Sequence, residues 1–208
     1  MDNRTRILDA YTEHLREHGH PPATVYRFAK GLELDERAFF QEFPSLDAVE
    51  SALWQSLVDR VAAAVTSGAE WEGFTARQRL LTFLFAFSEE SLAWRSLLLS
   101  RVAPVAVVAR PPHLKGLETG FKAFIRPVLD HGLATGEIAE RGQASALYPE
   151  AFYLHFRAVL DFLLKDGSAG FERTDAYIEK SVTLAFDLLR TQAIDSAVDF
   201  ARFLLSRP

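Results

Sequence analysis

Two short stretches near the N-terminus carry polar side chains at a spacing that suits contact with nucleic acid. In the first, a hydroxyl, an aromatic ring and a cation gather at the start of an expected helix, where free backbone N–H groups attract phosphate, and a second cation follows three residues later. In the second, an arginine and a glutamine four residues apart share one helical face, and both residue types read base edges in a DNA groove. These candidate DNA contacts are Thr24, Tyr26, Arg27, Lys30, Arg37 and Gln41.

The apolar residues around these side chains predict two short helices joined by a tight turn. Val25, Phe28, Ala29 and Leu32 recur at the helical period and share a face. The second helix is expected to begin after Asp35, a residue that caps free N–H groups, and to direct Phe39, Phe40 and Phe43 into the same core. Two such helices, with polar residues outward on the second, are typical of a helix-turn-helix.

With its flanks, this stretch resembles the TetR family of bacterial repressors. The resemblance is carried by Arg6-Ile7-Leu8-Asp9-Ala10, Glu17-His18-Gly19, Thr24-Val25, Phe28-Ala29 and Phe39-Phe40-Gln41-Glu42-Phe43, followed by Ser45 and Val49. It implies an all-α protein with an N-terminal helix-turn-helix domain and a larger C-terminal helical bundle. The chain departs from the family pattern at five positions. Glu33 replaces the turn glycine, Ala38 replaces a small residue or Thr that faces phosphate, and Phe40 replaces a Tyr that contacts phosphate. Glu42 replaces a His, and Leu46 replaces the Lys at the start of the next helix.

The charge of the N-terminal module predicts weak DNA binding. Through residue 50 the chain has six basic and ten acidic residues, a balance of about −4. Because DNA affinity comes largely from neutralising phosphates with Lys and Arg, this balance disfavours tight non-specific binding.

Composition narrows the class of protein. The chain has 208 residues, of which 49% are hydrophobic and 25% charged, with 17 Phe and no Cys. The absence of Cys removes disulfides and thiolate chemistry, and neither a leader segment nor a membrane-spanning stretch is recognisable, so we expect a cytoplasmic protein. No phosphate-binding glycine loop or nucleophile elbow is present. His14, His18 and His20 are close in sequence but are expected to be solvent-facing, so we predict no enzymatic activity, no cofactor and no metal site.

Helical periodicity continues to the C-terminus without sustained strand-like alternation. We expect a helix-turn-helix domain over residues 1–45 and a helical ligand-binding and dimerisation domain over 46–208. Within the second domain, helices are predicted to begin at Thr75 and to cover 91–101, 143–165, 174–191 and 195–206.

Aromatic side chains in the middle of the chain predict a cavity for a small apolar ligand. Breaks at Gly73, Pro104 and Pro127 favour irregular packing there, although a filled core is the commoner outcome for such residues. Arg95, His131, Tyr153 and His155 are available to orient a ligand. The candidate pocket residues are Phe83, Phe87, Trp94, Phe121, Phe124, Phe152 and Phe156.

Helices 143–165 and 174–191 are apolar on two sides, which predicts that they pair with a second copy of the chain as a four-helix interface. The candidate interface residues are Tyr153, Val159, Phe162, Ile178, Val182 and Leu189.

Two functions fit these patterns. The first is a TetR-like, homodimeric transcriptional regulator that senses a small apolar effector and binds operator DNA weakly. The second is a lipid- or isoprenoid-binding protein that resembles the lipid-binding proteins of ubiquinone biosynthesis and has lost DNA binding. The stripe at 195–206 has few cations, so packing on protein is favoured over a membrane surface.

Overall fold

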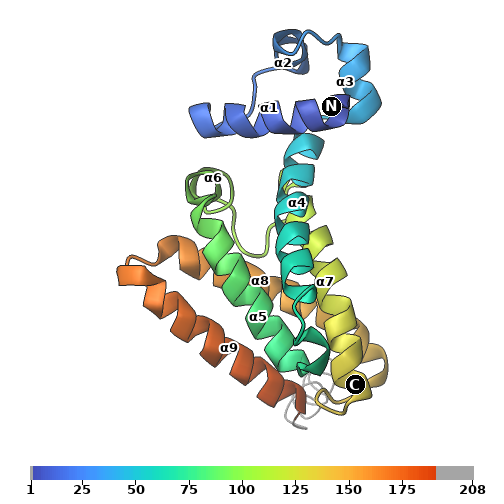
Figure 1. The fold of residues 1–208 in the computed structure, drawn as a ribbon, viewed down its shortest axis with the longest axis vertical. Helices are drawn as coiled ribbons and strands as arrows, with labels where there is room; N and C mark the ends of the chain where they lie inside the picture. Colours follow the sequence, from blue (N-terminus) through green and yellow to red (C-terminus); the bar gives the residue numbers. More distant parts are fainter. Residues whose placement is uncertain (1, 191–208) are drawn as a thin grey trace, which may run out of the picture.

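The computed structural model describes residues 2–190, and within this range the chain forms α-helices, short 3-10 turns and loops. A small N-terminal module stands on one end of a long helix, α4, which enters a larger helical body (Figure 1). The α-helices are α1 (Asn3–His18), α2 (Val25–Gly31), α3 (Glu36–Glu42), α4 (Leu46–Thr66), α5 (Ala76–Leu92), α6 (Arg95–Arg101), α7 (Lys115–Ala134), α8 (Tyr148–Lys165) and α9 (Glu172–Arg190).

Short polar residues set the helix boundaries. Asp35 accepts a hydrogen bond from the Ala38 N–H at 2.7 Å at the start of α3, as the sequence predicted. Thr75 and Gln78 form a reciprocal capping box at the start of α5. Gly19 ends α1 with a φ of 72°, a left-handed conformation that glycine adopts at little cost.

The N-terminal module has its own aromatic core. Tyr11 of α1 meets Phe28 of α2 edge-on at 5.9 Å, and Phe28 meets Phe39 of α3 at 6.3 Å. Phe39 and Phe43 point into this core as predicted, but Phe40 does not, because half of its surface is exposed. The three helices therefore hold together through rings that leave the outward faces of α2 and α3 polar.

Helix α4 joins the module to the body by packing closely along α7. A Cβ at Gly116 would lie 1.7 Å from the Ser51 carbonyl oxygen, and a Cβ at Gly120 would lie 3.0 Å from Val58. Glycine at these positions brings the two backbones together, so any side chain at residue 116 would force α7 away from α4.

The body is a bundle in which α5 packs against α4, α7 and α9, and α8 packs against α7 and α9. Two predicted boundaries are corrected. Helix α5 continues to Leu92, so the next helix begins at Arg95 and not at residue 91. Residues 142–147 form a separate 3-10 segment, because Pro149 lacks an N–H and fits the first turn of α8 rather than its interior.

Pro127 does not mark a break, since it lies inside the continuous helix α7. Between residues 2 and 190 no helix is both long and apolar enough to span a lipid bilayer. The predicted helix at 195–206 lies outside the described residues.

Candidate nucleic-acid interface and ligand site

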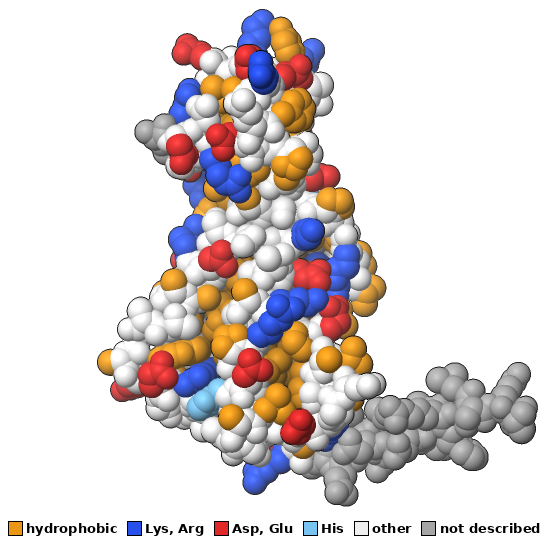
Figure 2. All heavy atoms as spheres, turned by 90° about the vertical axis from the view of Figure 1, so that its right-hand side faces the viewer, with side chains coloured by type: hydrophobic (Ala, Val, Ile, Leu, Met, Phe, Trp, Pro, Cys, Tyr) orange, Lys and Arg blue, Asp and Glu red, His pale blue; other side chains and the backbone are white. Residues whose placement is uncertain are grey.

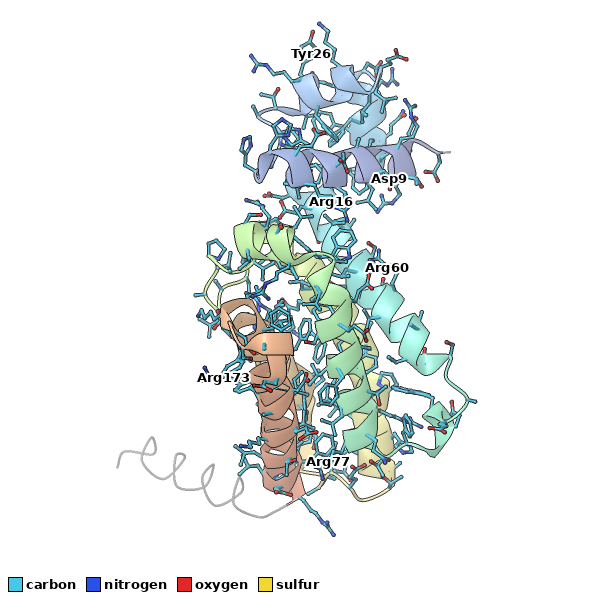
Figure 3. All side chains as sticks on the ribbon, turned by 60° about the vertical axis from the view of Figure 1, so that its left-hand side comes forward. Asp9, Arg16, Tyr26, Arg60, Arg77 and Arg173 are labelled. Carbon is cyan, nitrogen blue, oxygen red and sulfur yellow. The ribbon has the colours of Figure 1, made fainter. Side chains whose placement is uncertain are left out.

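The six candidate DNA-contact side chains are all exposed on the module. Tyr26 is 57% exposed and lies at the end of the module remote from the body (Figure 3). Thr24 caps α2 by accepting from the Arg27 N–H at 3.2 Å, which orients the first turn outward. Arg37 and Gln41 share the exposed face of α3. All six side chains are therefore accessible to a partner of the module.

Three other basic residues of the module are engaged in contacts within the protein. Arg4 donates to the Glu42 carbonyl at 2.9 Å and Arg6 donates to the Leu32 carbonyl at 2.8 Å, so both secure helix ends. Arg16 stacks on the ring of Trp94 at 4.9 Å, facing the body. Acidic and basic side chains are interspersed on the face shown in Figure 2. The cations directed outward near α2 and α3 are thus Arg27, Lys30 and Arg37.

The turn between α2 and α3 is strained. Glu33 adopts a φ of 57°, the left-handed region in which a side chain costs about 1 kcal/mol or more relative to glycine. Glutamate occupies this position in place of glycine, the residue that a left-handed backbone conformation favours.

A buried carboxylate connects the module to the body. Glu50 of α4 is fully buried and accepts from the Tyr11 hydroxyl at 3.0 Å and from Trp54 Nε1 at 3.3 Å. Arg101, at the end of α6, donates to both of its oxygens. This hydrogen bond with Glu50 raises the pKa of Arg101, while burial and the Glu50 charge raise the pKa of Tyr11. Helices α1, α4 and α6 therefore meet at the buried carboxylate of Glu50.

A second junction forms around Trp94. Its ring lies between the guanidinium groups of Arg16, from α1, and Arg60, from α4. Its Nε1 donates to Glu90, which also pairs with Arg60 at 3.1 Å. Trp94 was a candidate for lining the pocket, and the structure places it between the module and the body.

The other candidate pocket residues are buried, and most of them pack ring against ring. Phe83 stacks on Phe124 at 4.1 Å, Phe121 lies parallel to Phe156 at 4.5 Å, and Phe87 meets Phe156 edge-on at 4.8 Å. These five rings form a continuous cluster inside the body, which we call the phenylalanine cluster. Phe152 lies apart from it, against Phe186 at 5.9 Å.

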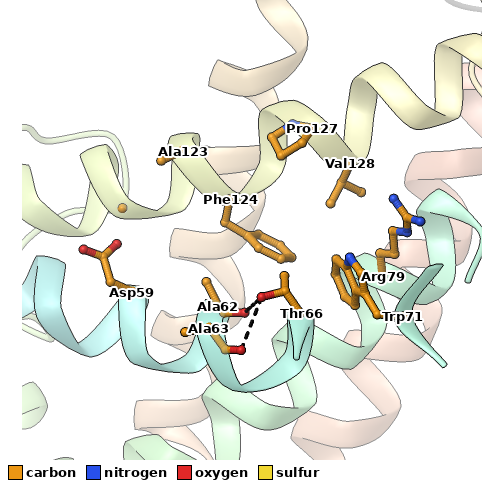
Figure 4. A pocket seen from close by; sticks show the side chains of 11 residues that line it. Asp59, Ala62, Ala63, Thr66, Trp71, Arg79, Ala123, Phe124, Pro127 and Val128 are labelled. Carbon is orange, nitrogen blue, oxygen red and sulfur yellow. Dashed lines mark hydrogen bonds between the residues drawn. The ribbon is translucent and has the colours of Figure 1, made fainter. Parts of the chain in front are cut away.

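Phe124 also lines a groove of about 420 Å³ between α4 and α7 (Figure 4). Arg79 closes one end of this groove, stacked at 5.2 Å on Trp71, with its Nε buried and without a hydrogen-bond partner. Its Nη2 lies 3.7 Å from the carboxylate of Glu72. The groove is lined by Asp59, Ala62, Ala63, Thr66, Trp71, Arg79, Gly120, Ala123, Phe124, Pro127 and Val128.

A second groove, of about 410 Å³, lies beside Tyr153, where the connection from α6 reaches α7. Arg110 stacks on the Tyr153 ring at 4.6 Å and pairs with Glu150 at 2.6 Å and with Glu118 at 3.3 Å. Lys122 pairs with the same two carboxylates. The groove is lined by Arg110, Pro111, Pro112, Leu114, Lys115, Glu118 and Tyr153.

This arrangement of a three-helix module and a helical body is also found in known proteins. Residues 79–204 match the family model described as the tetracyclin repressor-like C-terminal domain. The chain belongs to the TetR family. No curated protein sequence matches it.

Solved structures of TetR-type proteins share its fold. One is a TetR-family transcription regulator from Shewanella sp. PV-4, with 17% identity, a TM-score of 0.59, and 89% of this chain and 96% of that chain covered. The fatty acid degradation regulator FadR from Bacillus halodurans has 15% identity and a TM-score of 0.58, over 88% and 95%. RolR in complex with resorcinol has 17% identity and a TM-score of 0.54, over 99% and 93%.

Most of the candidate dimer residues of this TetR-family chain point into its own core. Tyr153, Val159, Ile178, Val182 and Leu189 are buried within the protomer, and Phe162 is half-buried. The apolar side chains of α8 and α9 that remain at least partly exposed are, apart from Phe162, not the other candidates. They include Leu154, Ala158, Phe162, Tyr177 and Leu184.

The candidate ligand-orienting polar groups serve different roles. Arg95 donates to the carbonyls of Leu163, Leu164 and Asp166 and so caps the end of α8. His155 Nε2 lies 2.8 Å from the Ser181 hydroxyl oxygen, and burial lowers the pKa of His155 to about 4. In the described part of the chain, no group of three or more His, Asp or Glu side chains is placed to hold a metal ion.

Sequence reasoning missed three charged residues that are buried within helices, Glu50, Arg79 and Arg157. Each occupies a position on a helix face that is otherwise apolar: Arg157 lies one turn after Tyr153 and one residue after Phe156. A charged residue within an apolar stripe is the signal that points to such a group, because burial of an unpaired charge is costly.

Proposed function

We propose that the protein is a dimeric, ligand-controlled transcriptional regulator that binds operator DNA through α2 and α3. The observation that carries this proposal is the arrangement of the module, in which Tyr11, Phe28, Phe39 and Phe43 form a buried core. All six candidate DNA contacts are exposed around it. Arg27 lies in the first turn of α2, where a helix N-terminus favours phosphate, and Lys30 is a second exposed cation in the last turn. Arg37 with Gln41 supplies base-reading groups.

Control by a ligand requires that the body and the module be mechanically connected. Glu50 and Trp94 supply two connections, since each contacts α1 on one side and the helices of the body on the other. A ligand that prefers one position of α6 or α4 shifts the spacing of the two modules by its differential affinity.

The ligand is proposed to be small and largely apolar, held near the phenylalanine cluster. Phe124 connects this cluster to the groove between α4 and α7. Likenesses to FadR and to a RolR–resorcinol complex support a ligand of this kind, one named for fatty acid degradation and the other binding a small aromatic molecule.

Dimerisation is proposed to use the outward faces of α8 and α9. Phe162 and Tyr177 stack on each other at 4.5 Å with ring planes 7° apart and remain partly exposed, and Leu184 is 59% exposed. Two copies pairing through these faces bury apolar surface that one protomer leaves in water.

The alternative is a carrier of lipid or isoprenoid molecules that no longer binds DNA. It is favoured by one observation: Arg4, Arg6 and Arg16 are occupied within the protein, while Glu33, Asp35 and Glu36 are exposed near the expected phosphates.

Selection of bound duplexes from a random pool at low salt separates the two functions. Enrichment of a palindrome with two half-sites supports the dimeric regulator. Absence of enrichment, together with extraction of a lipid from the purified protein, supports the carrier.

A further inference from the structure

Arg157 of α8 carries a positive charge in the interior of the body. The residue is 2% exposed, and arginine stays protonated throughout the physiological pH range. Its Nη2 donates to the Val105 carbonyl at 3.4 Å, a long hydrogen bond, while Nε and Nη1 are buried without a partner.

Asp161, Glu118 and Glu150 form ion pairs with cations other than Arg157. Asp161, one turn further along α8, pairs with Lys165 at 2.7 Å. Glu118 and Glu150 both pair with Arg110 and Lys122. Across residues 2–190, no carboxylate forms an ion pair with Arg157, so its charge lacks the compensation that buried charges normally have.

Tyr153 connects Arg157 to the groove of about 410 Å³ described above. The two side chains are four residues apart on α8, and the Arg157 guanidinium is close enough to oppose the rise that burial causes in the pKa of Tyr153. Tyr153 itself lines the groove. Tyr153 therefore lines the groove and lies beside Arg157, which does not itself line the groove.

Apolar surface continues from the same wall. The Tyr153 ring centroid lies 6.4 Å from those of both Phe121 and Phe156, which stack on each other in the phenylalanine cluster. A molecule that enters beside Tyr153 meets a cation and an aromatic surface together. At the groove, exposed Lys115 favours the approach of negative charge, whereas Arg110 is already paired with Glu118 and Glu150.

We propose that the ligand of this regulator is an amphipathic anion, a small carboxylic acid whose carboxylate pairs with Arg157 while its apolar part packs on the phenylalanine cluster. Because Arg157 and the phenylalanine cluster are buried, the carboxylate reaches Arg157 when the segment that carries Val105, whose carbonyl accepts from Arg157, moves aside. This inference rests on the proposed function, because it names the chemistry of the ligand that the regulator senses.

Thermal denaturation of the full-length protein with matched probe pairs tests the inference. The probes are octanoate, decanoate, benzoate and phenylacetate, each compared with the alcohol of the same skeleton. At least one carboxylate is expected to raise the melting temperature and to bind about tenfold more tightly than its alcohol, the usual strength of a hydrogen bond to a charged group. Equal binding of the two members of every pair, or binding of none of the carboxylates, overturns the proposal.

Arg157→Met locates the site, because methionine keeps the length of the side chain and removes its charge. The variant is expected to be at least as stable as the parent without ligand, and to lose the preference for the carboxylate. Arg126→Met on the exposed surface of α7 is the matched control and should keep that preference. Retained preference in Arg157→Met overturns the assignment of the site. If Arg157→Met does not fold, the carboxylate–alcohol comparison on the parent still decides the ligand class.

Operator release is measured separately, so that the two proposals fail in different ways. If a carboxylate binds but does not change DNA binding, this inference is supported and the proposed regulatory function is contradicted. Release of operator by neutral molecules alone leaves the regulatory function standing and removes this inference.

Discussion

Arg101 and Glu50 form a two-pronged ion pair that fastens the end of α6 to the beginning of α4. Arg101 Nε lies 3.0 Å from Glu50 Oε1, and Nη2 lies 3.0 Å from Oε2. Because Tyr11 of α1 donates to the same carboxylate, movement of α6 should alter a bond that also holds the N-terminal module. A bidentate geometry restrains orientation as well as distance, so this pair is suited to transmit rotation between the helices.

We expect Glu50 and Arg101 to be strongly coupled in stability. Glu50→Gln or Arg101→Met alone should lower the free energy of unfolding by about 3 kcal/mol, since each leaves a partner charge without compensation. The double variant should lose less than the sum of the two. Urea denaturation of the four proteins measures the coupling, and a value below about 0.5 kcal/mol contradicts the inferred connection.

Glu33→Gly should stabilise the protein by about 1 kcal/mol, because glycine relieves the left-handed backbone at φ 57°. Glu33→Ala is the matched control: it removes the same charge and keeps the strain. Denaturation midpoints compare the two variants, while both should strengthen DNA binding to a similar extent through loss of the charge. Equal stabilisation by alanine and glycine is the result that refutes backbone strain at this turn.

His155 should make stability depend on pH. Burial lowers its pKa to about 4 from an unfolded value near 6.5, so below pH 6.5 the unfolded chain takes up a proton that the folded chain does not. The stability contributed by neutral His155 is present above pH 6.5 and is lost as the pH falls toward 4, by roughly 3 kcal/mol in total. Denaturation at fixed protein concentration across this range should show a smaller loss for His155→Gln, which can still bond to Ser181. Identical pH profiles contradict the prediction.

Helix positions and caps were readable from the sequence because they depend on local chemistry. Asp35 and Thr75 lie at helix ends in the structure, as their residue types predicted. The family and its all-α fold were predicted from a resemblance carried by residues in the first quarter of the chain, and the match over residues 79–204 confirms the family.

The sequence did not indicate which apolar side of α8 and α9 faces the core of the protomer and which side a partner could cover. Ile178 and Val182 of α9 share an apolar stripe that fits either the protomer core or a partner, and packing against the rest of the body places them inside. Periodicity defines which residues share a face, but the identity of the surface that covers the face depends on tertiary contacts. Arg157 was missed for a related reason, since a polar residue is assigned to solvent until its neighbours are known.

Leu184→Lys should convert a dimer into a folded monomer. Leu184 is mostly exposed in the protomer, so a lysine there adds little strain to the fold but places a charge in an apolar interface. Sedimentation at micromolar concentration should give half the parent's mass, with an unchanged helical spectrum. Glu89→Lys, an exposed charge change on α5, is the control and should remain dimeric. A parent protein that is itself monomeric contradicts the proposed interface.

DNA binding should be weak, with a shallow dependence on salt. Arg27 and Lys30 supply two phosphate contacts per protomer and four per dimer, which gives a slope of log affinity against log salt of about −4. Glu42→Lys adds one cation per protomer, so it should tighten binding to all sequences and steepen the slope to about −5 or −6.

Arg37→Ala should instead cost about 1–3 kcal/mol and relax specificity at one base position, leaving the slope nearly unchanged. Arg126→Ala, on the body, should alter neither property. Fluorescence anisotropy with the selected duplex across a salt series measures all four proteins. Parallel losses for Arg37→Ala on specific and random duplexes mean that Arg37 contacts phosphate rather than a base, and no binding by any variant favours the lipid carrier.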